Sequence, residues 1–426
     1  MLASLPVRAA VEIQQVTSPG GINAWLVEEH SIPFTALEIR FKGGASLDAP
    51  GKRGAINLMT GLIEEGAGDL DARGFAEAAE ELAARFEFDV YDDALSVSAQ
   101  FLTENRDASV ALLKSALTEP RFDVDAIERV RGQVLSIIRS DATDPDEIAS
   151  QTFDRLMYGD HPYGSSPNGT IESVGALTRD DIVAAHRQVI SRDHVYVGAV
   201  GDITAEELGA LLDALLGDLP AQGAPEPPAA ELLLDGGVTV VPFETPQSVA
   251  IFGHAGIPRD DPDFFAAFVM NQILGGGNFS SRLMEEVREK RGLTYGVYSY
   301  LVDKDYADLL MGRVASANDR IAEAISVIRD EWARIAAEGV GQQELEDAKT
   351  YLTGAYPLRF DGNARIAGIL VGMQMSDLPV DYIATRNDKV NAVTMEEIKR
   401  VAARLVDPDA LHFVVVGQPE GLEATN

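Results

Sequence analysis

Apolar residues recur along the chain with two different spacings. Residues 35–41 and 94–101 alternate apolar and polar side chains, which predicts strands with one buried face. Residues 71–85 and 124–138 place apolar side chains three and four positions apart, which predicts amphipathic helices. Strands and helices come in blocks without strict alternation. This order favours an α+β sandwich, with helices on one face of a sheet.

The same pattern occurs twice along the sequence. Residues 177–201 contain a helix start led by threonine and an apolar strand that ends at glycine, and residues 393–417 repeat both features at an offset of 216 residues. Earlier in each half, residues 41–50 resemble residues 253–262 at an offset of 212. A nearly constant offset predicts two homologous copies of one α/β domain.

The two copies are separated by a proline-rich stretch. Residues 219–228 contain four prolines, which cannot sustain a helix or an inner strand. We therefore predict an N-terminal domain over residues 1–218, an extended linker over residues 219–235 and a C-terminal domain over residues 236–426. A chain of 426 residues is also long enough for two or three domains.

Composition excludes several classes of function. The net charge of −33 repels phosphate backbones, so we expect no nucleic-acid partner. The chain has no cysteine, which excludes disulfides and thiolate metal sites. No apolar run approaches the roughly 18 residues that a membrane span needs. Residues 1–10 do not resemble a signal peptide, so the sequence predicts a cytoplasmic protein, or a periplasmic one if a signal peptide has been removed.

Histidine spacing gives no sign of a zinc site in this chain. A zinc peptidase commonly takes two ligands from one turn of a helix, at positions three or four residues apart. No two of the six histidines have that spacing, which leaves only a site built from scattered residues. The chain also lacks the Gly-x-Ser-x-Gly sequence of a serine nucleophile elbow.

A glycine run and an Arg/Tyr pair form the chain's most informative segment. Gly275, Gly276 and Gly277 follow a helical pattern and lack the Lys-Ser/Thr of a phosphate loop, so they predict a turn that ends a helix. Residues 280–291 predict a second helix, which Gly292 ends before a strand over residues 295–300. Arg288 near that helix end and Tyr295 just beyond the turn can therefore converge.

These residues resemble the pitrilysin/insulinase family of inverted-zincin metallopeptidases, in its bacterial and mitochondrial-processing-peptidase-like branch. The most specific match covers residues 281–295 with the glycine-rich loop before them. Residues 159–164, 169–173 and 355–363 support it. The resemblance covers essentially the whole chain and implies two homologous α/β sandwich domains, a metallohydrolase-like tandem repeat.

The family's catalytic residues are missing from the matching positions. Active members carry an H-x-x-E-H helix that supplies two zinc ligands and the general base. Asn57, Thr60 and Gly61 occupy the His, Glu and second His places, on one helix face. The third ligand, a glutamate in the family, aligns with Ile137. The resemblance therefore implies that this chain binds no metal and does not act as an enzyme alone.

Family heterodimers give such a chain a role. One subunit carries the zinc helix, while the other carries an Arg/Tyr pair and a glycine-rich loop. By this resemblance, Arg288 and Tyr295 act at the zinc site of a homologous H-x-x-E-H partner, and Gly275, Gly276 and Gly277 contact the peptide substrate. Zinc is expected in the partner subunit, and the reaction is peptide-bond hydrolysis.

Two other hypotheses come from different classes. The first is a catalytically inert structural or assembly subunit of the same fold, which would need neither Arg288 nor Tyr295. The second is a self-sufficient hydrolase that uses another site, which the missing ligands argue against. Because a fold does not by itself give a function, cleavage assays must separate these hypotheses.

Overall fold

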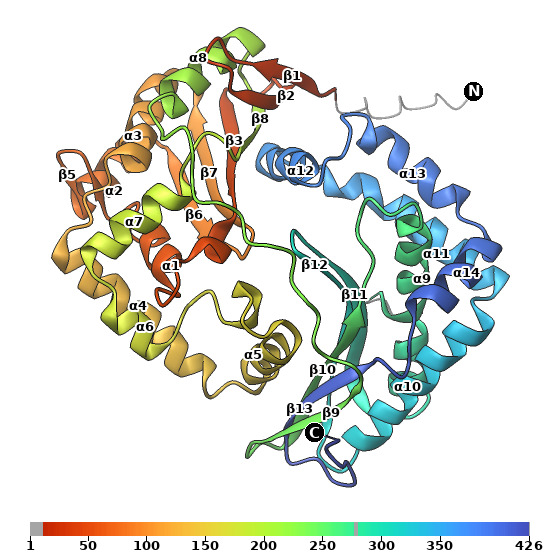
Figure 1. The fold of residues 1–426 in the computed structure, drawn as a ribbon. Helices are drawn as coiled ribbons and strands as arrows, with labels where there is room; N and C mark the ends of the chain where they lie inside the picture. The colour runs from red at the N-terminus through yellow and green to blue at the C-terminus, as the bar shows by residue number, and fades with distance from the viewer. Residues whose placement is uncertain (1–11, 277–279, 426) are drawn as a thin grey trace, which may run out of the picture. The chain divides into compact units, whose positions relative to one another are not determined.

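The structure of the chain is a computed structural model that describes residues 12–276 and 280–425. The chain forms two compact units, each with one main β-sheet and covering helices (Figure 1). Unit 1 contains Met1–Ile138, Ser166–Pro227 and Leu358–Thr385. Unit 2 contains Arg139–Ser165, Pro228–Pro357 and Arg386–Asn426. Each unit therefore takes segments from both halves of the sequence.

The sheet of unit 1 has six strands in the order β1-β2-β8-β3-β7-β6. Its only parallel pair, among the described strands, is β2 with β8. The strands are β1 (Gln14–Thr17), β2 (Asn23–Glu28), β3 (Phe34–Lys42), β6 (Arg85–Val90), β7 (Ala94–Leu102) and β8 (Val195–Gly201). A separate two-stranded ladder joins β4 (Gly66–Ala67) and β5 (Leu70–Asp71).

The sheet of unit 2 repeats this topology. Its order is β11-β12-β10-β13-β9, and β13 with β9 is again the parallel pair. The strands are β9 (Gly237–Pro242), β10 (Gln247–Ala255), β11 (Thr294–Lys304), β12 (Ala307–Ala317) and β13 (His412–Gly417). The strands predicted over residues 35–41, 94–101 and 295–300 are β3, β7 and part of β11. The predicted α+β fold with two sandwich domains is confirmed.

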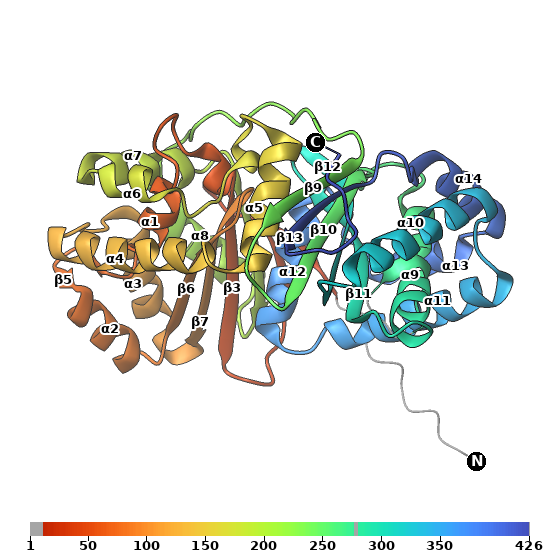
Figure 2. The ribbon, with the colours of Figure 1, turned by 90° about the horizontal axis from the view of Figure 1, so that it is seen from below.

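The helices pack mainly on one face of each sheet (Figure 2). The α-helices are α1 (Ala55–Thr60), α2 (Ala72–Glu81), α3 (Arg106–Thr118), α4 (Val124–Asp141), α5 (Pro145–Tyr158), α6 (Ile171–Ala176), α7 (Arg179–Val189), α8 (Ala205–Leu216), α9 (Phe264–Gly275), α10 (Ile321–Glu338), α11 (Gln342–Ala355), α12 (Asn363–Met375), α13 (Tyr382–Ala392) and α14 (Met395–Leu405). Short 3-10 turns are η1 (Gly44–Leu47), η2 (Thr103–Asn105), η3 (Pro162–Gly164) and η5 (Tyr356–Arg359), while η4 (Met284–Glu289) is a π-helix.

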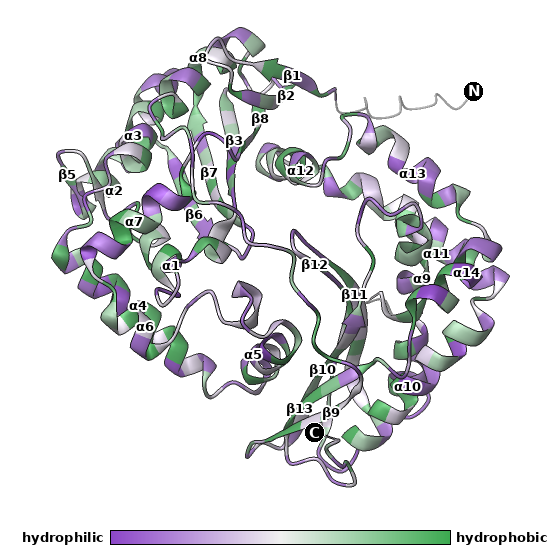
Figure 3. Ribbon diagram, viewed as in Figure 1, coloured by the Kyte–Doolittle hydropathy of each residue, from purple (hydrophilic) through white to green (hydrophobic). Residues whose placement is uncertain are grey.

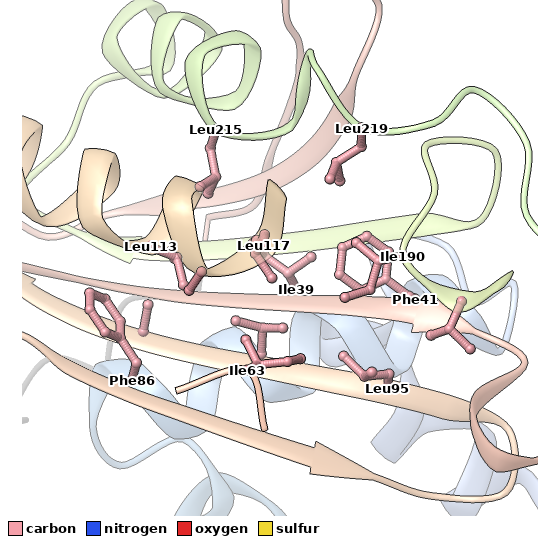
Figure 4. Packing of buried hydrophobic residues seen from close by; sticks show 14 of the residues in the cluster. Ile39, Phe41, Ile63, Phe86, Leu95, Leu113, Leu117, Ile190, Leu215 and Leu219 are labelled. Atoms are coloured by element: carbon pink, nitrogen blue, oxygen red, sulfur yellow. The ribbon is translucent and has the colours of Figure 1, made fainter. Parts of the chain in front are cut away.

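Many helices contain both hydrophobic and hydrophilic residues, as amphipathic helices do (Figure 3). The core of unit 1 lies between its sheet and the helices. Ile39 and Phe41 of β3 and Leu95 of β7 lie in one cluster with Leu113 and Leu117 of α3 (Figure 4). In unit 2 the corresponding core contains Phe252 of β10, Phe413 of β13 and Trp332 of α10, which are all fully buried.

Each sheet also carries one helix on its second face, which the sequence pattern did not predict. In unit 1 this helix is α12, and the Gln374 side-chain amide donates a hydrogen bond to the Val197 carbonyl of β8 at 2.9 Å. Gly198 permits the contact, because a Cβ there would lie 2.6 Å from the Ala367 carbonyl oxygen. In unit 2 the helix is α5, which packs against β10 and β13.

The helix predicted over residues 71–85 is shorter in the structure. Asp71 caps its start by accepting a hydrogen bond from the Gly74 N–H at 2.8 Å. Ala83 adopts a left-handed backbone conformation with φ of 49°, and the Ala84 N–H bonds back to the Ala79 carbonyl. This turn ends α2 at Glu81, so β6 can begin at Arg85.

Candidate functional site

The segment with Arg288 begins as the predicted helix and continues as a π-helix. Leu283 and Val287 are fully buried, as the predicted apolar face requires. The Lys290 N–H reaches back five residues to the Glu285 carbonyl at 2.9 Å. π-Helical turns are rare in proteins as a whole, but those that occur are frequently found at functional sites. The wider turn changes where the side chains point.

Two ion-pair networks hold this short helix in place. At its start, Nε and Nη2 of Arg282 each donate to the Glu344 carboxylate of α11 at 2.7 Å. Near its end, Lys290 and Arg291 both donate to Glu286. The Lys290 ammonium, and then the Arg291 guanidinium, hold the pKa of Glu286 below its usual range. Arg288 therefore lies on a segment that is tied to α11 at its start and closed by its own ion pairs near its end.

A glycine turn connects the π-helix to β11. Gly292 has φ of 63°, in the left-handed region that favours glycine, and its N–H donates to the Arg288 carbonyl at 2.8 Å. The turn directs the chain into β11 at Thr294, as the sequence predicts. Arg288 and Tyr295 thus flank one tight turn.

Tyr295 lies in a β-bulge at the start of β11. The pairing of β11 with β12 changes register between Thr294 and Val297. The Thr294 hydroxyl stabilises the irregular backbone, since it accepts from the Gly296 N–H at 3.1 Å and bonds to the Ala315 carbonyl of β12 at 2.6 Å. Tyr295 is 89% exposed, a high value for an aromatic residue in a strand. Bulges redirect side chains in this way and are common near functional sites.

Arg288 and Tyr295 line the same open cavity of unit 2, whose volume is about 440 Å³. Both residues of the predicted pair thus lie beside one cavity, and their joint role stays a prediction. The Arg288 side chain is partly exposed and lies 3.4 Å from the Glu289 carboxylate. The cavity is also lined by polar side chains that the sequence analysis did not single out: Gln247, Thr294, Ser316 and Arg320.

The described glycines of the predicted glycine-rich loop have packing roles. Gly275 is buried at the end of α9, where a Cβ would lie 2.3 Å from the Ser299 hydroxyl and 2.6 Å from its backbone nitrogen. At Gly276 a Cβ would meet the side chain and backbone of Gln272. Gly277 lies outside the described residues. Substrate contact by this loop stays a prediction.

The four positions aligned with zinc ligands and base lie in unit 1. The Asn57 amide donates to the Asn168 side-chain oxygen at 3.1 Å, and the buried Thr60 hydroxyl donates to the Ile56 carbonyl at 2.8 Å. Gly61 follows the last residue of α1, and a Cβ there would lie 3.1 Å from Val130 of α4. Ile137 is 48% exposed on α4. Asn57 and Thr60 thus take part in local structure, and the alignment of all four positions stays a prediction.

No group of three or more His, Asp or Glu side chains in the described part of the chain could hold a metal ion. His186 is buried and hydrogen-bonded to the Leu117 carbonyl at 2.9 Å. His254 is also buried, and it accepts from the Trp332 indole N–H at 3.0 Å. Burial lowers the pKa of both imidazoles, which fits neutral packing residues.

Comparisons with known proteins place this geometry in a family. Residues 176–352, which include the Arg288 and Tyr295 segment, match a family model described as the peptidase M16 inactive domain. A crystal structure of a peptidase M16 inactive domain from Pseudomonas fluorescens is 28% identical, with a TM-score of 0.90 and coverage of 97% of this chain and 100% of that chain. The chain is a peptidase M16 homologue.

Other relatives agree with this assignment. The non-peptidase homolog YmxG of Helicobacter pylori is 27% identical over 390 residues, 91% of this chain and 90% of that protein. An uncharacterized zinc protease of Streptomyces coelicolor is 27% identical over 408 residues, 92% of this chain and 86% of that protein. A Helicobacter pylori protease structure shares the fold with a TM-score of 0.86 at 17% identity. The predicted family resemblance is confirmed.

One segment that carries the predicted resemblance makes structural contacts in unit 2. Residues 159–164 follow α5, and the Tyr163 hydroxyl accepts from the Tyr306 backbone N–H at 3.2 Å. The His161 and Tyr163 rings lie 4.6 Å apart, and the Lys304 ammonium lies 4.3 Å from the centre of the Tyr163 ring. This motif ties α5 to the turn between β11 and β12 within unit 2.

Among the helices of the described chain, none combines the length and apolar character that crossing a membrane requires.

Proposed function

We propose that this M16 homologue is the non-catalytic subunit of a heterodimeric zinc metallopeptidase. It binds peptide substrate and supplies Arg288 and Tyr295 to the zinc site of a homologous H-x-x-E-H subunit. The observation that carries the proposal is the shared cavity of Arg288 and Tyr295, built by a π-helix, a left-handed glycine and a β-bulge. A purely structural subunit has no need for an exposed tyrosine directed by such a bulge.

The two side chains suit the stabilisation of a developing negative charge. When water attacks a peptide carbonyl, its oxygen gains charge, and hydrogen-bond donors fixed around it lower the barrier. The Tyr295 hydroxyl and the Arg288 guanidinium are such donors. The ion pairs of Arg282 and Glu286 hold the helix that carries Arg288, so its backbone needs little reorganisation. Removal of one such donor typically costs a factor of about 10²–10³ in kcat.

Zinc and the general base would come from the partner subunit. The names of the matching family model and of the Helicobacter pylori relative support an inactive role for this chain. A carboxamide at position 57, a hydroxyl at position 60 and a hydrogen atom at position 61 supply neither ligand nor base. The peptide would add as a strand to an exposed sheet edge of the partner's zinc domain.

Cleavage of a quenched-peptide library tests the proposal. The chain alone should be inactive, and cleavage should appear when an H-x-x-E-H homologue from the same genome is added. Tyr295→Phe should then lower kcat by about 10²–10³-fold. Tyr351→Phe is the matched control, because Tyr351 is also exposed, at 51%, but lies on α11 outside the cavity.

Two results would overturn the proposal. If the complex forms but Tyr295→Phe cleaves as fast as the unchanged protein, the chain is an inert assembly subunit. If the chain alone cleaves peptides and a chelator stops it, the alignment of Asn57, Thr60 and Gly61 with the zinc helix is wrong.

A further inference from the structure

The cavity of Arg288 and Tyr295 contains a second arginine from a distant part of the sequence. Arg320 lies directly before α10, and it lines the cavity together with Gln247 of β10. Its Nη1 donates to the Gly292 carbonyl at 3.0 Å, and the Gly292 N–H in turn donates to the Arg288 carbonyl. The glycine turn thus fixes one guanidinium and the backbone of the other arginine at the same cavity.

The charge of the cavity contrasts with that of the whole chain. Its lining has two guanidinium groups and one carboxylate, that of Glu289. The chain as a whole has a net charge of −33. Arg320 makes no ion pair with the described acidic residues. Within the described part of the chain, its hydrogen bond to the Gly292 carbonyl uses one of its five N–H donors. A net positive cavity on a strongly acidic protein selects for an anionic ligand.

The donors and the volume of the cavity suit a small planar anion. Guanidinium groups bind carboxylates with two parallel hydrogen bonds, and the Gln247 amide can add a neutral donor. A volume of about 440 Å³ lies in the lower part of the range for ligand sites, enough for a terminal residue of a peptide.

The neighbouring strand supplies a place for the rest of a peptide. β11 starts at the cavity and has a described strand neighbour, β12, on one side only. An edge strand presents backbone N–H and C=O groups that an extended peptide can pair with. When the partner's sheet edge is absent, a peptide that pairs along β11 would place its end group beside Tyr295, where β11 begins.

We propose that Arg320 binds a carboxylate of the peptide at the cavity that it shares with Arg288 and Tyr295, whose donors stay assigned to the scissile carbonyl. The choice of peptides as ligands rests on the proposed function. The carboxylate can be the free C-terminus or an Asp or Glu side chain. Arg320 lies outside the predicted Arg/Tyr pair, so its role can be tested without the partner.

Direct binding to the chain alone tests this site. Fluorescence anisotropy is measured with three N-terminally labelled peptides of one sequence: a free acid without Asp or Glu, its C-terminal amide, and the amide with one internal Glu. The acid or the Glu peptide should bind at least about tenfold more tightly than the plain amide, because hydrogen bonds to charged groups are the strong ones. Which of the two binds tightly identifies the source of the carboxylate.

Variants connect the preference to Arg320. Arg320→Gln should bring the carboxylate peptide to the affinity of the plain amide, and Arg320→Lys should keep part of the preference. Arg73→Gln is the matched control, because Arg73 is an exposed arginine on α2 and its side chain is 85% accessible. Thermal unfolding of each variant checks that loss of the Gly292 hydrogen bond has not unfolded the turn.

Equal affinity of all three peptides would overturn the carboxylate site, as would a carboxylate preference that survives in a folded Arg320→Gln variant. Neither result would disturb the proposed function, which depends on partner-dependent cleavage and on Tyr295→Phe. Loss of cleavage in the Tyr295 variant with no carboxylate preference would leave the proposed function and remove this inference alone.

Discussion

The two units share one strand order but differ in what they expose at their candidate sites. In unit 1 the Asn57 and Thr60 side chains are hydrogen-bonded to neighbours, and the space beside Gly61 is limited by Val130. In unit 2 an irregular backbone directs an exposed tyrosine to an open cavity with two arginines. Polar groups in the first region are bonded within the fold, whereas the second region presents an exposed tyrosine at a cavity. The second region is therefore the place to look for function.

The sharpest test of this contrast compares one side chain from each region. In the complex with the zinc subunit, Arg288→Ala should lower kcat/KM by about 100-fold or more, because a charged donor to the oxyanion is lost. Asn57→Ala should leave the rate within about twofold, since its amide bonds only to Asn168 among the described residues. Steady-state cleavage by the two complexes, at equal zinc content, provides the measurement. A large loss in the Asn57 variant would move the functional region to unit 1.

The next largest effect concerns the ion pair that holds the π-helix beside the cavity. Arg282→Ala should lower the free energy of unfolding of unit 2 by about 2–3 kcal/mol, because Arg282 is buried and bridges η4 to α11. The value lies below that of a fully buried pair because the Glu344 side chain is 37% exposed. Urea unfolding gives the change, and hydrogen exchange of residues 282–289 should show the largest loss of protection. Unchanged exchange there would mean that the ion pair does not hold the π-helix.

A matched pair of glycine substitutions compares packing in the two regions. Gly275→Ala should cost about 2 kcal/mol, because its Cβ would meet the backbone nitrogen of Ser299 at 2.6 Å. Gly61→Ala should change stability by less than about 0.5 kcal/mol, since its Cβ would meet one Val130 methyl group at 3.1 Å. Thermal unfolding of both variants checks the order. If Gly61→Ala lowers the free energy of unfolding more than Gly275→Ala does, Gly61 is the more tightly packed position of the two.

The smallest effect is a gain of stability in unit 2. Burial, and then the charges of Asp303 and Asp260, raises the pKa of Asp308 to about 6. The folded state therefore binds this proton more tightly than the unfolded chain, so the contribution of Asp308 to stability is largest below about pH 4 and is lost as pH rises through about 6. Asp308→Asn should remove that loss and add about 1 kcal/mol at pH 7, a value reduced for solvent screening.

Urea unfolding at pH 4 and pH 7 measures the effect, with Asp319→Asn, an exposed acid of the same unit, as the control. If Asp308→Asn stabilises equally at both pH values, the carboxyl group does not titrate in this range.

The sequence predicted the strands and the overall fold well because their signals are local. β3 and β7 alternate apolar and polar residues in sequence, although most residues of both strands are buried in the structure. Gly292 and Gly201 mark the ends of elements. Arg288 and Tyr295 were recognised together because they belong to one continuous motif. They lie seven positions apart in the sequence, and a single turn brings them to one cavity.

The remaining features depend on tertiary contacts that a sequence does not display. Arg320 belongs to the cavity only because β12 runs back beside β11. The π-helix at Arg288 looks like an ordinary amphipathic helix in its apolar spacing. The sequence also gives no sign of which sheet α5 and α12 cover, because an amphipathic helix reads the same against either partner. The partly buried ion pair of Arg282 joins residues 62 positions apart.

The distribution of each unit over distant segments sets the order in which the protein can fold during synthesis. Unit 1 ends at Thr385, although its sheet is complete at β8. At roughly 5–20 residues per second, a ribosome needs about 8–35 s between β8 and the helix α12 that covers the second face. During that interval the nascent sheet keeps an apolar surface open to chaperones. Deletion of residues 358–385 should therefore yield a protein that aggregates, rather than a shorter soluble one.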